Sequence, residues 1–579
     1  MAVKPEKPQP TTLDKDPANA WQGLACWRML DTRFEQGKRF FESWQAWRTD
    51  PQRSRLLHYV ALTQASPTGP ELSGGAGKDP ALILLAQVLA SQWFGLQPGF
   101  HRFLLDQGQV VLTLCVGDTL GLLRQQQFEA DTVALHVPEA DADALWTIKA
   151  LARCCRRGTG LVVRAPTADA LSTAGRHLSQ CGFDIKTPAV SSASPAPATL
   201  EASFNPHWAL KNTRQNAMAT AFPPGTCAVI GAGLAGASVA AALARRGWQV
   251  TVLDRAEAPA AGASGLPVGL VVPHVSADDC ALSRLSRSGV RLMLQQARSL
   301  LVAGQDWAPT GVLERDIGNK HITTQDIWHP QAAWLKPAQL VRAWLSQPGI
   351  TFMGKAEVAQ LRQRDGAWEL LDAHGQVLCC AGRVVLANAC GAATLLQRLE
   401  LDKPQRAPDL ARLPAIHGMR GLLSWAMHDD TGKAVFPPHP VNGSGSMVPR
   451  VPMEGGTAWF MGSSYQPDSQ PERPDQDNHL RNWQHLQPLL PELAQQLQQR
   501  FESGALHSWK NTRCITTDRL PAVGPLETSD APGLWICAGL GSRGLSFSVL
   551  CADLLAARWG AEPWPVEASL AKALNALRH

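Results

Sequence analysis

The chain has 579 residues, of which 45% are hydrophobic and 18% are charged, and its formal net charge is +5. This composition is typical of a soluble globular protein, and the length is enough for two or more domains with sizeable cores. The mildly basic charge permits a nucleic-acid partner but does not indicate one by itself. The thirteen cysteines form no CxxC pair and no His/Cys spacing typical of a metal site, so we expect no metal and a reducing, cytoplasmic environment.

The N-terminal half of the sequence predicts a short tail, an α/β unit and a linker. Residues 1–25 begin with a polar, proline-rich stretch, which predicts disorder and no secretory signal peptide. Apolar segments then alternate with helix-like ones over residues 26–189, a pattern typical of an α/β fold. The clearest of these segments are 57–62, 81–94, 109–116, 131–137 and 159–165. A Ser/Pro/Ala-rich linker is expected over 190–223, and a second domain over 224–579.

A strand, a turn, a helix and a second strand follow one another between Cys227 and Asp254. Residues 227–230 are apolar and predict a buried parallel strand. The alanine-rich run to Arg246 predicts a helix, and 249–253 predict the second strand. A transmembrane helix is the alternative, because 227–244 carry no charge. That run is glycine-rich and only just reaches the length of about 18–20 residues that a span needs, so we expect no membrane segment.

The turn in this stretch has the glycine spacing of a dinucleotide-binding site. Gly231 allows the tight turn, Gly233 lets the backbone approach a pyrophosphate, and Gly236 lets the helix pack on the strand. The helix N-terminus offers free N–H groups to the phosphates. Asp254 ends the second strand and is placed to accept hydrogen bonds from a ribose hydroxyl. The order of these features predicts a bound dinucleotide.

Four later segments indicate that the dinucleotide is a flavin. They are 262–279, 381–392, 511–525 and 533–557, and the last reads as a strand, a glycine-rich turn and a helix. A second helix N-terminus could therefore face the cofactor. Within these segments and the turn above, the residues we expect to contact FAD are Gly231, Gly233, Gly236, Asp254, Ser264, Ala387, Gly541, Ser542, Gly544 and Leu545.

The second domain resembles the D-amino-acid oxidase and glycine oxidase superfamily, and most closely the oxidoreductase half of the MnmC family. The residues that carry this resemblance are Ser276–Arg284, 334–340, 384–389, 516–525 and 539–545. The resemblance implies an FAD-binding dinucleotide fold with an inserted α+β substrate domain. It also implies the activity: FAD-dependent removal of the carboxymethyl group from 5-carboxymethylaminomethyl-uridine, often 2-thiolated, at the tRNA wobble position.

A carboxylate substrate favours an arginine that can bind it through two hydrogen bonds. Arg513 lies where glycine-oxidase-like relatives carry their carboxylate-binding arginine, and Arg543 in the glycine-rich turn is the second candidate. Each could instead form a structural salt bridge. His274 and His417 are isolated histidines, which we expect in the core or in loops rather than as catalytic bases.

The first domain resembles the methyltransferase half of the same family, a truncated Rossmann-like unit that uses S-adenosylmethionine. Segments 40–62, 96–118 and 150–165 carry this resemblance. Three places depart from the family pattern. The family has a glycine-rich turn at 30–41, a glutamate where this chain has Thr63, and an aspartate where it has His136.

Arg33, Glu35 and Lys38 stand in that turn, where only Gly37 remains, and we expect them to block the approach of the methyl donor. Gly117-Asp118 survives but cannot make a site alone. These departures favour a degenerate domain retained as a scaffold or tRNA platform; a diverged but active methyltransferase is the alternative. For the whole chain, the alternatives are a small-molecule amine or amino-acid oxidase and a non-catalytic tRNA-binding flavoprotein.

Overall fold

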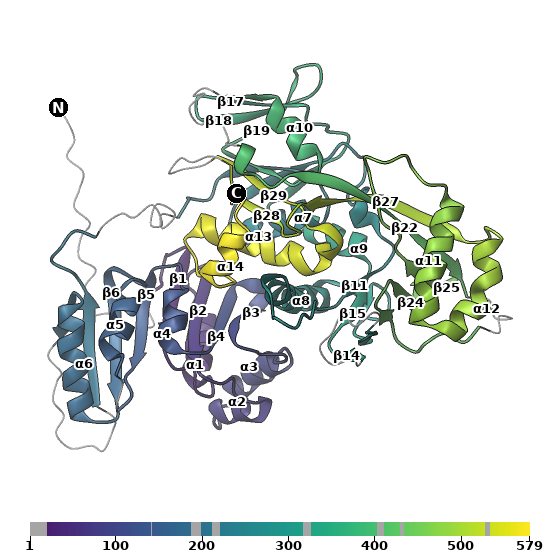
Figure 1. The fold of residues 1–579 in the computed structure, drawn as a ribbon. Coiled ribbons are helices and arrows are strands. Elements are labelled where there is room, and N and C mark those ends of the chain that lie inside the picture. Colours follow the sequence, from purple (N-terminus) through teal and green to yellow (C-terminus); the bar gives the residue numbers. More distant parts are fainter. Residues whose placement is uncertain are drawn as a thin grey trace. The chain divides into compact units, whose positions relative to one another are not determined.

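The computed structural model describes residues 20–139, 142–186, 198–210, 221–316, 326–401, 410–428, 434–526 and 533–578. The chain forms two compact units: Met1–Phe222 with Ala557–Ser569, and Pro223–Ala556 with Leu570–His579 (Figure 1). Of the segment expected to be disordered, residues 1–19 lie outside the described part. Trp21 is packed, because its indole is 3% exposed and its Nε1 donates a hydrogen bond to Asp50 Oδ2 at 2.8 Å.

The first unit is built on one eight-stranded sheet of order β3-β4-β2-β1-β5-β6-β8-β7. Its strands are β1 Cys26–Asp31, β2 Leu56–Thr63, β3 Gly99–Leu105, β4 Val110–Val116, β5 Ala130–His136, β6 Cys155–Ala165, β7 Phe183–Lys186 and β8 Ala198–Phe204. Strands β4, β2, β1, β5 and β6 are parallel, and β3, β8 and β7 complete the edges with antiparallel pairs. The strand order grows outward from β1 in both directions, so the point where it reverses lies between β1 and β5.

Helices cover both faces of this sheet, as the alternating pattern predicted. They are α1 Lys38–Thr49, α2 Gly69–Gly75, α3 Pro80–Ala90, α4 Thr119–Arg124, α5 Ala144–Ala152 and α6 Ala168–Gln180. One apolar cluster lies with α1 and α3, and a second lies with α4, α5 and α6. Strand β2 is buried over seven of its eight residues, which explains its continuous apolar sequence.

Two parts of the first unit differ from the expected boundaries. Strand β8 lies inside the segment that was expected to be a linker. This segment forms a strand because pairing with β6 and β7 satisfies backbone groups that a linker would leave to water. The C-terminal segment Ala557–Ser569 also belongs to this unit. Two contacts join this segment to the strands of the first unit. Arg28 Nη1 donates a hydrogen bond to Ala561 O at 2.9 Å, and His58 Nε2 lies 3.2 Å from Glu562 Oε2.

The second unit contains the predicted dinucleotide fold. Its six-stranded sheet has the order β16-β10-β9-β20-β29-β28. The strands are β9 Thr226–Ile230, β10 Gln249–Leu253, β16 Ile350–Met353, β20 Arg383–Leu386, β28 Ala522–Pro525 and β29 Leu534–Ala538, and all but β28 run parallel. The helices of this part are α7 Leu234–Ala244, α8 Ala281–Leu300, α9 Pro337–Leu345, α10 Gly391–Gln397, α13 Gly544–Gly560 and α14 Ala568–Ala573.

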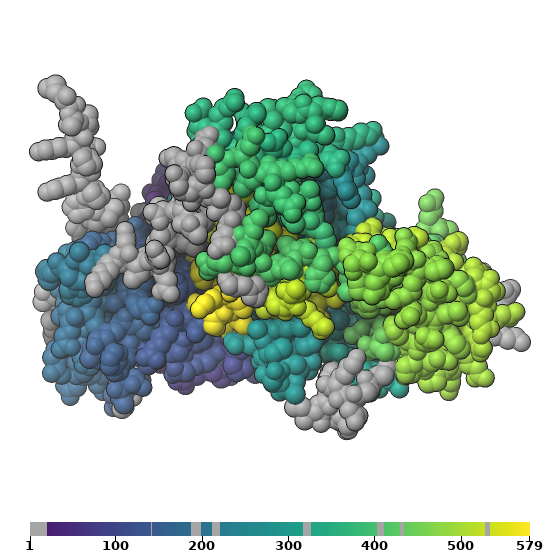
Figure 2. Space-filling view, turned by 45° about the horizontal axis from the view of Figure 1, so that its top comes forward, coloured from purple at the N-terminus to yellow at the C-terminus, as the bar shows by residue number. Residues whose placement is uncertain are grey.

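The rest of the second unit is the expected α+β insertion with two small sheets. Its main sheet contains β13 Val312–Glu314, β14 Ile327–His329, β22 Ile416–Met427, β23 Val441–Asn442, β24 Ser446–Met453, β25 Gly456–Gly462, β26 Gln466–Pro467 and β27 His507–Thr516. Helices α11 Asp475–Leu489 and α12 Pro491–Glu502 pack on this sheet around a buried apolar cluster. They form the yellow-green mass of Figures 1 and 2.

The two small sheets lie beside these elements in the second unit. One holds β11 Gly269–Val271, β12 Trp307–Ala308 and β15 Ala333–Leu335, and the other holds β17 Gln360–Arg364, β18 Ala367–Leu371, β19 Val377–Ala381 and β21 Leu399–Glu400. The architecture confirms the predicted α/β class with an α+β insertion. Among the described helices, none has the length and apolar character that crossing a lipid bilayer would require.

Candidate active site

The glycine turn between β9 and α7 has no room for a Cβ atom at its three glycines. Gly231 has φ 106°, and a Cβ there would lie 2.6 Å from Ala387 O. A Cβ at Gly233 would lie 2.9 Å from Ser264 Oγ, and one at Gly236 would overlap the carbonyl of Gly231. The turn therefore needs glycine at these three positions, and the approach of a pyrophosphate to Gly233 stays a prediction.

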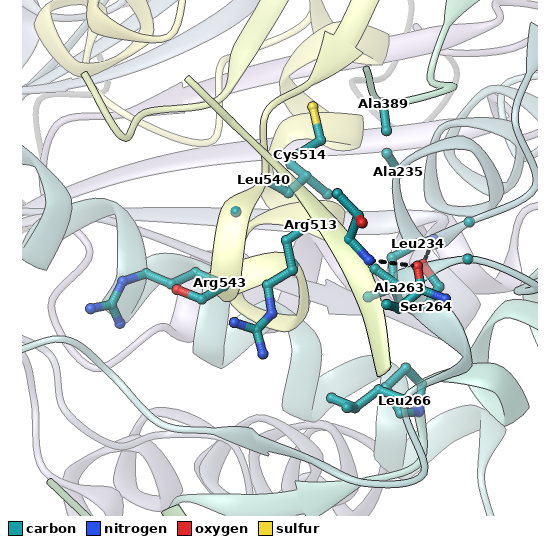
Figure 3. Close-up of a pocket in the computed structure, with 18 of the residues that line it drawn as sticks. Leu234, Ala235, Ala263, Ser264, Leu266, Ala389, Arg513, Cys514, Leu540 and Arg543 are labelled. Atoms are coloured by element: carbon teal, nitrogen blue, oxygen red, sulfur yellow. Dashed lines mark hydrogen bonds between the residues drawn. The ribbon is translucent and has the colours of Figure 1, made fainter. Parts of the chain in front are cut away.

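Two polar side chains hold this turn in place. Asp254, which directly follows β10, accepts hydrogen bonds from the N–H groups of Ala232 at 2.7 Å and Ala256 at 2.9 Å. Ser264 Oγ accepts one from Leu234 N–H at 2.9 Å, at the first residue of α7 (Figure 3). Asp254 thus stabilises the turn as well as facing the cavity in front of it.

A single cavity of about 1400 Å³ collects nearly all the predicted site residues of the second unit. It lies at the carboxyl ends of the parallel strands, where α/β sheets bind their ligands. Its lining includes Gly231, Gly233, Asp254, Ser264, Ala387, Gly541, Ser542, Gly544, Leu545, Arg513 and Arg543. Gly236 does not line it, because its role is the packing of α7 against the preceding turn.

The two predicted arginines face this cavity from different elements. Arg513 is on β27 and Arg543 is in the short helical turn Gly541–Arg543, and Figure 3 shows both side chains extending in the same direction. Arg513 Nη2 donates a hydrogen bond to Ser463 Oγ at 2.6 Å. Its Nη1 is buried and has no partner within the described part of the chain. The free edge of this guanidinium can therefore receive an anionic ligand.

The side chain of Arg543 has no ion pair or hydrogen bond to any described residue, and only its backbone N–H is paired, with Leu540 O at 3.2 Å. Burial lowers the pKa of its guanidinium, while the nearby Glu314 raises it. A buried arginine without a protein partner carries a desolvation cost that a bound anion would offset. The structural salt bridge that was the alternative for each arginine is thus absent among the described residues at both positions.

The comparisons with known proteins agree with this geometry. The DAO family model, described as FAD dependent oxidoreductase, matches residues 226–558. The tRNA 5-methylaminomethyl-2-thiouridine biosynthesis bifunctional protein MnmC of Albidiferax ferrireducens is 58% identical over 577 residues, 96% of this chain and 94% of that protein. The MnmC of Polaromonas naphthalenivorans is 45% identical over 96% of this chain and 91% of that protein.

The chain belongs to the MnmC family.

Its second unit is an FAD-dependent oxidoreductase of the DAO family. Among solved structures, glycine oxidase from Geobacillus kaustophilus has a TM-score of 0.48 and 17% identity, covering 61% of this chain and 98% of that one.

The residues of this MnmC-family chain fit FAD. Gly231 and Gly233 leave a cradle that a Cβ would fill. Asn388 Oδ1, beside this cradle, is buried without a hydrogen-bond partner in the described part of the chain. The first residues of α13, Gly544 and Leu545, also line the cavity. The two glycines, Asn388 and the start of α13 are therefore residues that could hold FAD.

Three cysteines that the sequence analysis missed also line the cavity, Cys390, Cys514 and Cys537, and the first two lie together. Cys514 follows Arg513 on β27, so its side chain points away from the guanidinium (Figure 3), and Cys390 directly precedes α10. The two thiols share a hydrogen bond, which lowers the pKa of Cys390 and raises that of Cys514. Only the three-dimensional pairing reveals this, because 123 residues of the sequence separate the two positions.

The two isolated histidines differ in position. His274 lines the cavity, where its Nδ1 lies 2.9 Å from Ser283 Oγ and its backbone N–H donates to Ser286 Oγ. His417 is exposed on β22 and does not line the cavity. Among the residues that the structure describes, no cluster of His, Cys, Asp or Glu side chains could hold a metal ion.

The corresponding region of the first unit lies at the end of β1. We expected Arg33, Glu35 and Lys38 to block it, but these side chains are exposed. Arg33 pairs with Glu35 at 3.2 Å, and Lys38 lies 3.9 Å from Glu42. Charged side chains in a surface turn stay hydrated, whereas filling a crevice would cost the free energy of desolvating them.

Two other side chains near this region are held by contacts within the first unit, Phe34 in the apolar cluster with α1 and α3, and Arg39 at the ends of two strands. Phe34 is 3% exposed, and its backbone N–H donates a hydrogen bond to Leu62 O at 2.8 Å. Arg39 Nη1 lies 2.8 Å from Asp31 Oδ1, and its Nη2 lies 3.4 Å from His136 Nε2. Since Asp31 ends β1 and His136 ends β5, Arg39 bridges the point where the strand order reverses.

Proposed function

We propose that this protein removes the carboxymethyl group from 5-carboxymethylaminomethyl-uridine, with or without 2-thiolation, at the wobble position of tRNA. The product is the aminomethyl nucleoside, and the carboxymethyl group leaves as glyoxylate. The names of the MnmC relatives support this substrate, since they refer to the biosynthesis of a methylaminomethyl-thiouridine in tRNA.

The observation that carries the proposal is the pair of arginines in the FAD cavity. The Nη1 of Arg513 and the guanidinium of Arg543 have no partner among the described residues and are two donors suited to a carboxylate. The substrate differs from an ordinary wobble uridine by a chain that ends in a carboxylate. A planar guanidinium can bind that carboxylate through two parallel hydrogen bonds and so fix the position of the neighbouring carbon–nitrogen bond.

The protein's part in the reaction is to bind, orient and desolvate the substrate. FAD, when bound, accepts the hydride released as the carbon–nitrogen bond is oxidised. Arg513 is held by Ser463, so its free edge has a fixed direction, and this orientation lowers the entropic part of the barrier. Water then cleaves the oxidised bond, which leaves the amine on the uridine and the carbonyl on glyoxylate.

We place this reaction in the cytoplasm. All thirteen cysteines are free thiols, including the neighbouring Cys390 and Cys514 in the cavity. Free thiols that lie this close together suit a reducing compartment.

We further propose that the first unit has lost the use of S-adenosylmethionine and serves as a scaffold or tRNA platform. Arg39 bridges Asp31 and His136 at the ends of β1 and β5, where a ligand of this fold would bind. Thr63, at the end of β2, donates its hydroxyl hydrogen bond to Ala65 O and offers no carboxylate to a ribose.

Nucleoside mass spectrometry of tRNA from a strain that lacks this protein tests the proposed function. We expect carboxymethylaminomethyl-uridine to accumulate and to disappear when the intact chain is restored. Restoration with Arg513→Met should leave the nucleoside in place. An unchanged nucleoside profile in the deletion strain would instead favour a small-molecule amine oxidase or a non-catalytic flavoprotein.

A further inference from the structure

One aromatic side chain at the FAD cavity has no role in the site described above. The chain contains only two tyrosines. Tyr59 is buried in the first unit at 1% exposure, whereas Tyr465 is 52% exposed and lines the cavity. Of the two tyrosines, only Tyr465 therefore presents its aromatic ring to a ligand in the cavity.

The backbone on both sides of Tyr465 is fixed. Ser464 and Gln466 are 2% and 5% exposed. The Ser464 N–H donates a hydrogen bond to Leu422 O at 3.2 Å, and Gln466 begins the short strand β26, which pairs with β22. Arg473 Nη1 donates to the carbonyl of Tyr465 itself at 3.3 Å. The exposed ring is therefore attached to a backbone segment that hydrogen bonds and buried neighbours hold in place.

The ring is also fixed relative to the carboxylate-binding arginine. The guanidinium carbon of Arg513 lies over the Tyr465 ring, 4.9 Å from its centroid. Since Arg513 covers one face, the exposed part of the ring remains for a ligand. In the proposed substrate, four bonds of about 1.5 Å join the uracil ring to the carboxylate carbon and span roughly 5 Å when extended. A base beside Tyr465 could thus place its carboxylate at Arg513.

Enzymes that act on a nucleobase take it out of its stack and hold it against aromatic side chains. We propose that Tyr465 is the surface on which the modified wobble base stacks while its carboxylate binds Arg513. This inference rests on the proposed function and extends it, because it assigns recognition of the base to one residue and recognition of the carboxylate to another.

Steady-state kinetics with an anticodon stem-loop that carries carboxymethylaminomethyl-uridine tests the assignment. Tyr465→Ala should raise KM roughly ten- to a hundredfold, because stacking on an aromatic ring is lost. Its kcat should change much less, and its FAD content should not change. Tyr465→Phe and Tyr465→Trp should restore KM. Trp328→Ala is the matched control, since Trp328 is 47% exposed in the same unit but does not line the cavity.

Competitive inhibition by glyoxylate separates stacking from an indirect effect on Arg513. Glyoxylate has a carboxylate but no base, so its inhibition constant should be the same in Tyr465→Ala and the wild type. A constant that rises as much as KM would show that Tyr465 acts only by holding Arg513 and would overturn the inference. An unchanged KM in Tyr465→Ala would overturn it as well. If the wild type itself does not convert the stem-loop, the proposed function fails and the inference falls with it.

Discussion

Arg513 and Ser463 form a 2.6 Å hydrogen bond that uses only one of the two terminal nitrogens of the guanidinium. The other nitrogen is buried without a partner in the described part of the chain. The protein therefore fixes the orientation of this guanidinium but leaves part of its hydrogen-bonding capacity unused. The relationship therefore explains how one arginine can both be rigid and bind a substrate carboxylate.

Substitution of this arginine should weaken substrate binding and leave the cofactor in place. In Arg513→Lys, a single ammonium cannot reproduce two parallel hydrogen bonds, and the loss of one charge-assisted bond costs about 1.5–3 kcal/mol. We expect kcat/KM with the modified tRNA to fall roughly ten- to a hundredfold. Arg420→Lys is the matched control, because Arg420 is on the neighbouring strand, does not line the cavity and bonds only the backbone carbonyls of Gln470 and Asp468. Equal turnover in Arg513→Lys would remove this residue from the site.

A carboxylate placed in the glycine turn should prevent the retention of FAD. The Cβ of Gly233→Asp would lie 2.9 Å from Ser264 Oγ, and its charge would oppose a pyrophosphate at the start of α7. The purified variant should therefore be colourless, as measured by its flavin absorbance. Gly69→Asp is the control, because a Cβ there meets nothing within 4 Å. Stoichiometric FAD in Gly233→Asp would mean that the cofactor binds elsewhere.

The thiol pair should give Cys390 a distinctive pH dependence. Its hydrogen bond with Cys514 lowers the pKa of Cys390, so the reactive thiolate persists to a lower pH than for an ordinary thiol. Iodoacetamide should therefore label Cys390 at lower pH, and Cys514→Ala should shift that profile to higher pH. Both residues line the FAD cavity, so bound FAD should slow the labelling, whereas the exposed Cys380 serves as the reference. Labelling of Cys390 at the same rate with and without FAD would contradict this placement.

Titration with S-adenosylmethionine tests the proposed loss in the first unit. The intact chain is required, because Ala557–Ser569 belongs to this unit and a fragment that ends near residue 200 lacks it. We expect no saturable heat in a calorimetric titration. The missing ribose carboxylate alone costs about 1.5–3 kcal/mol, and Arg39 lies between the ends of β1 and β5. Micromolar binding, or methyl transfer to aminomethyl-tRNA, would show a diverged but working methyltransferase.

The glycine turn that lines the cavity could be predicted from the sequence because its residues are local. Gly231, Gly233 and Asp254 lie within one strand–helix–strand stretch, and hydrophobic periodicity and glycine spacing identify such stretches directly. Arg513 and Arg543 were found by resemblance, since an arginine on a strand or in a turn has no distinguishing pattern of its own.

What the sequence did not predict depends on contacts between distant residues. Ser463, Tyr465 and Cys390 reach the cavity only because β25, β27 and β20 converge there. The inclusion of Ala557–Ser569 in the first unit is of the same kind, because it depends on partners such as His58 and Glu562 that lie about five hundred residues apart. In the first unit, the sequence located the altered turn and its charges but not the contacts of Arg39 with Asp31 and His136, which depend on the folded sheet.

The most direct test of the central claim is an anaerobic single turnover with the purified protein. Mixed with tRNA that carries carboxymethylaminomethyl-uridine, the protein should lose its oxidised-flavin absorbance and form aminomethyl-uridine and glyoxylate in equal amounts. The same tRNA without the modification should leave the flavin oxidised. A flavin that stays oxidised with the modified tRNA, together with an unchanged nucleoside, would contradict the account.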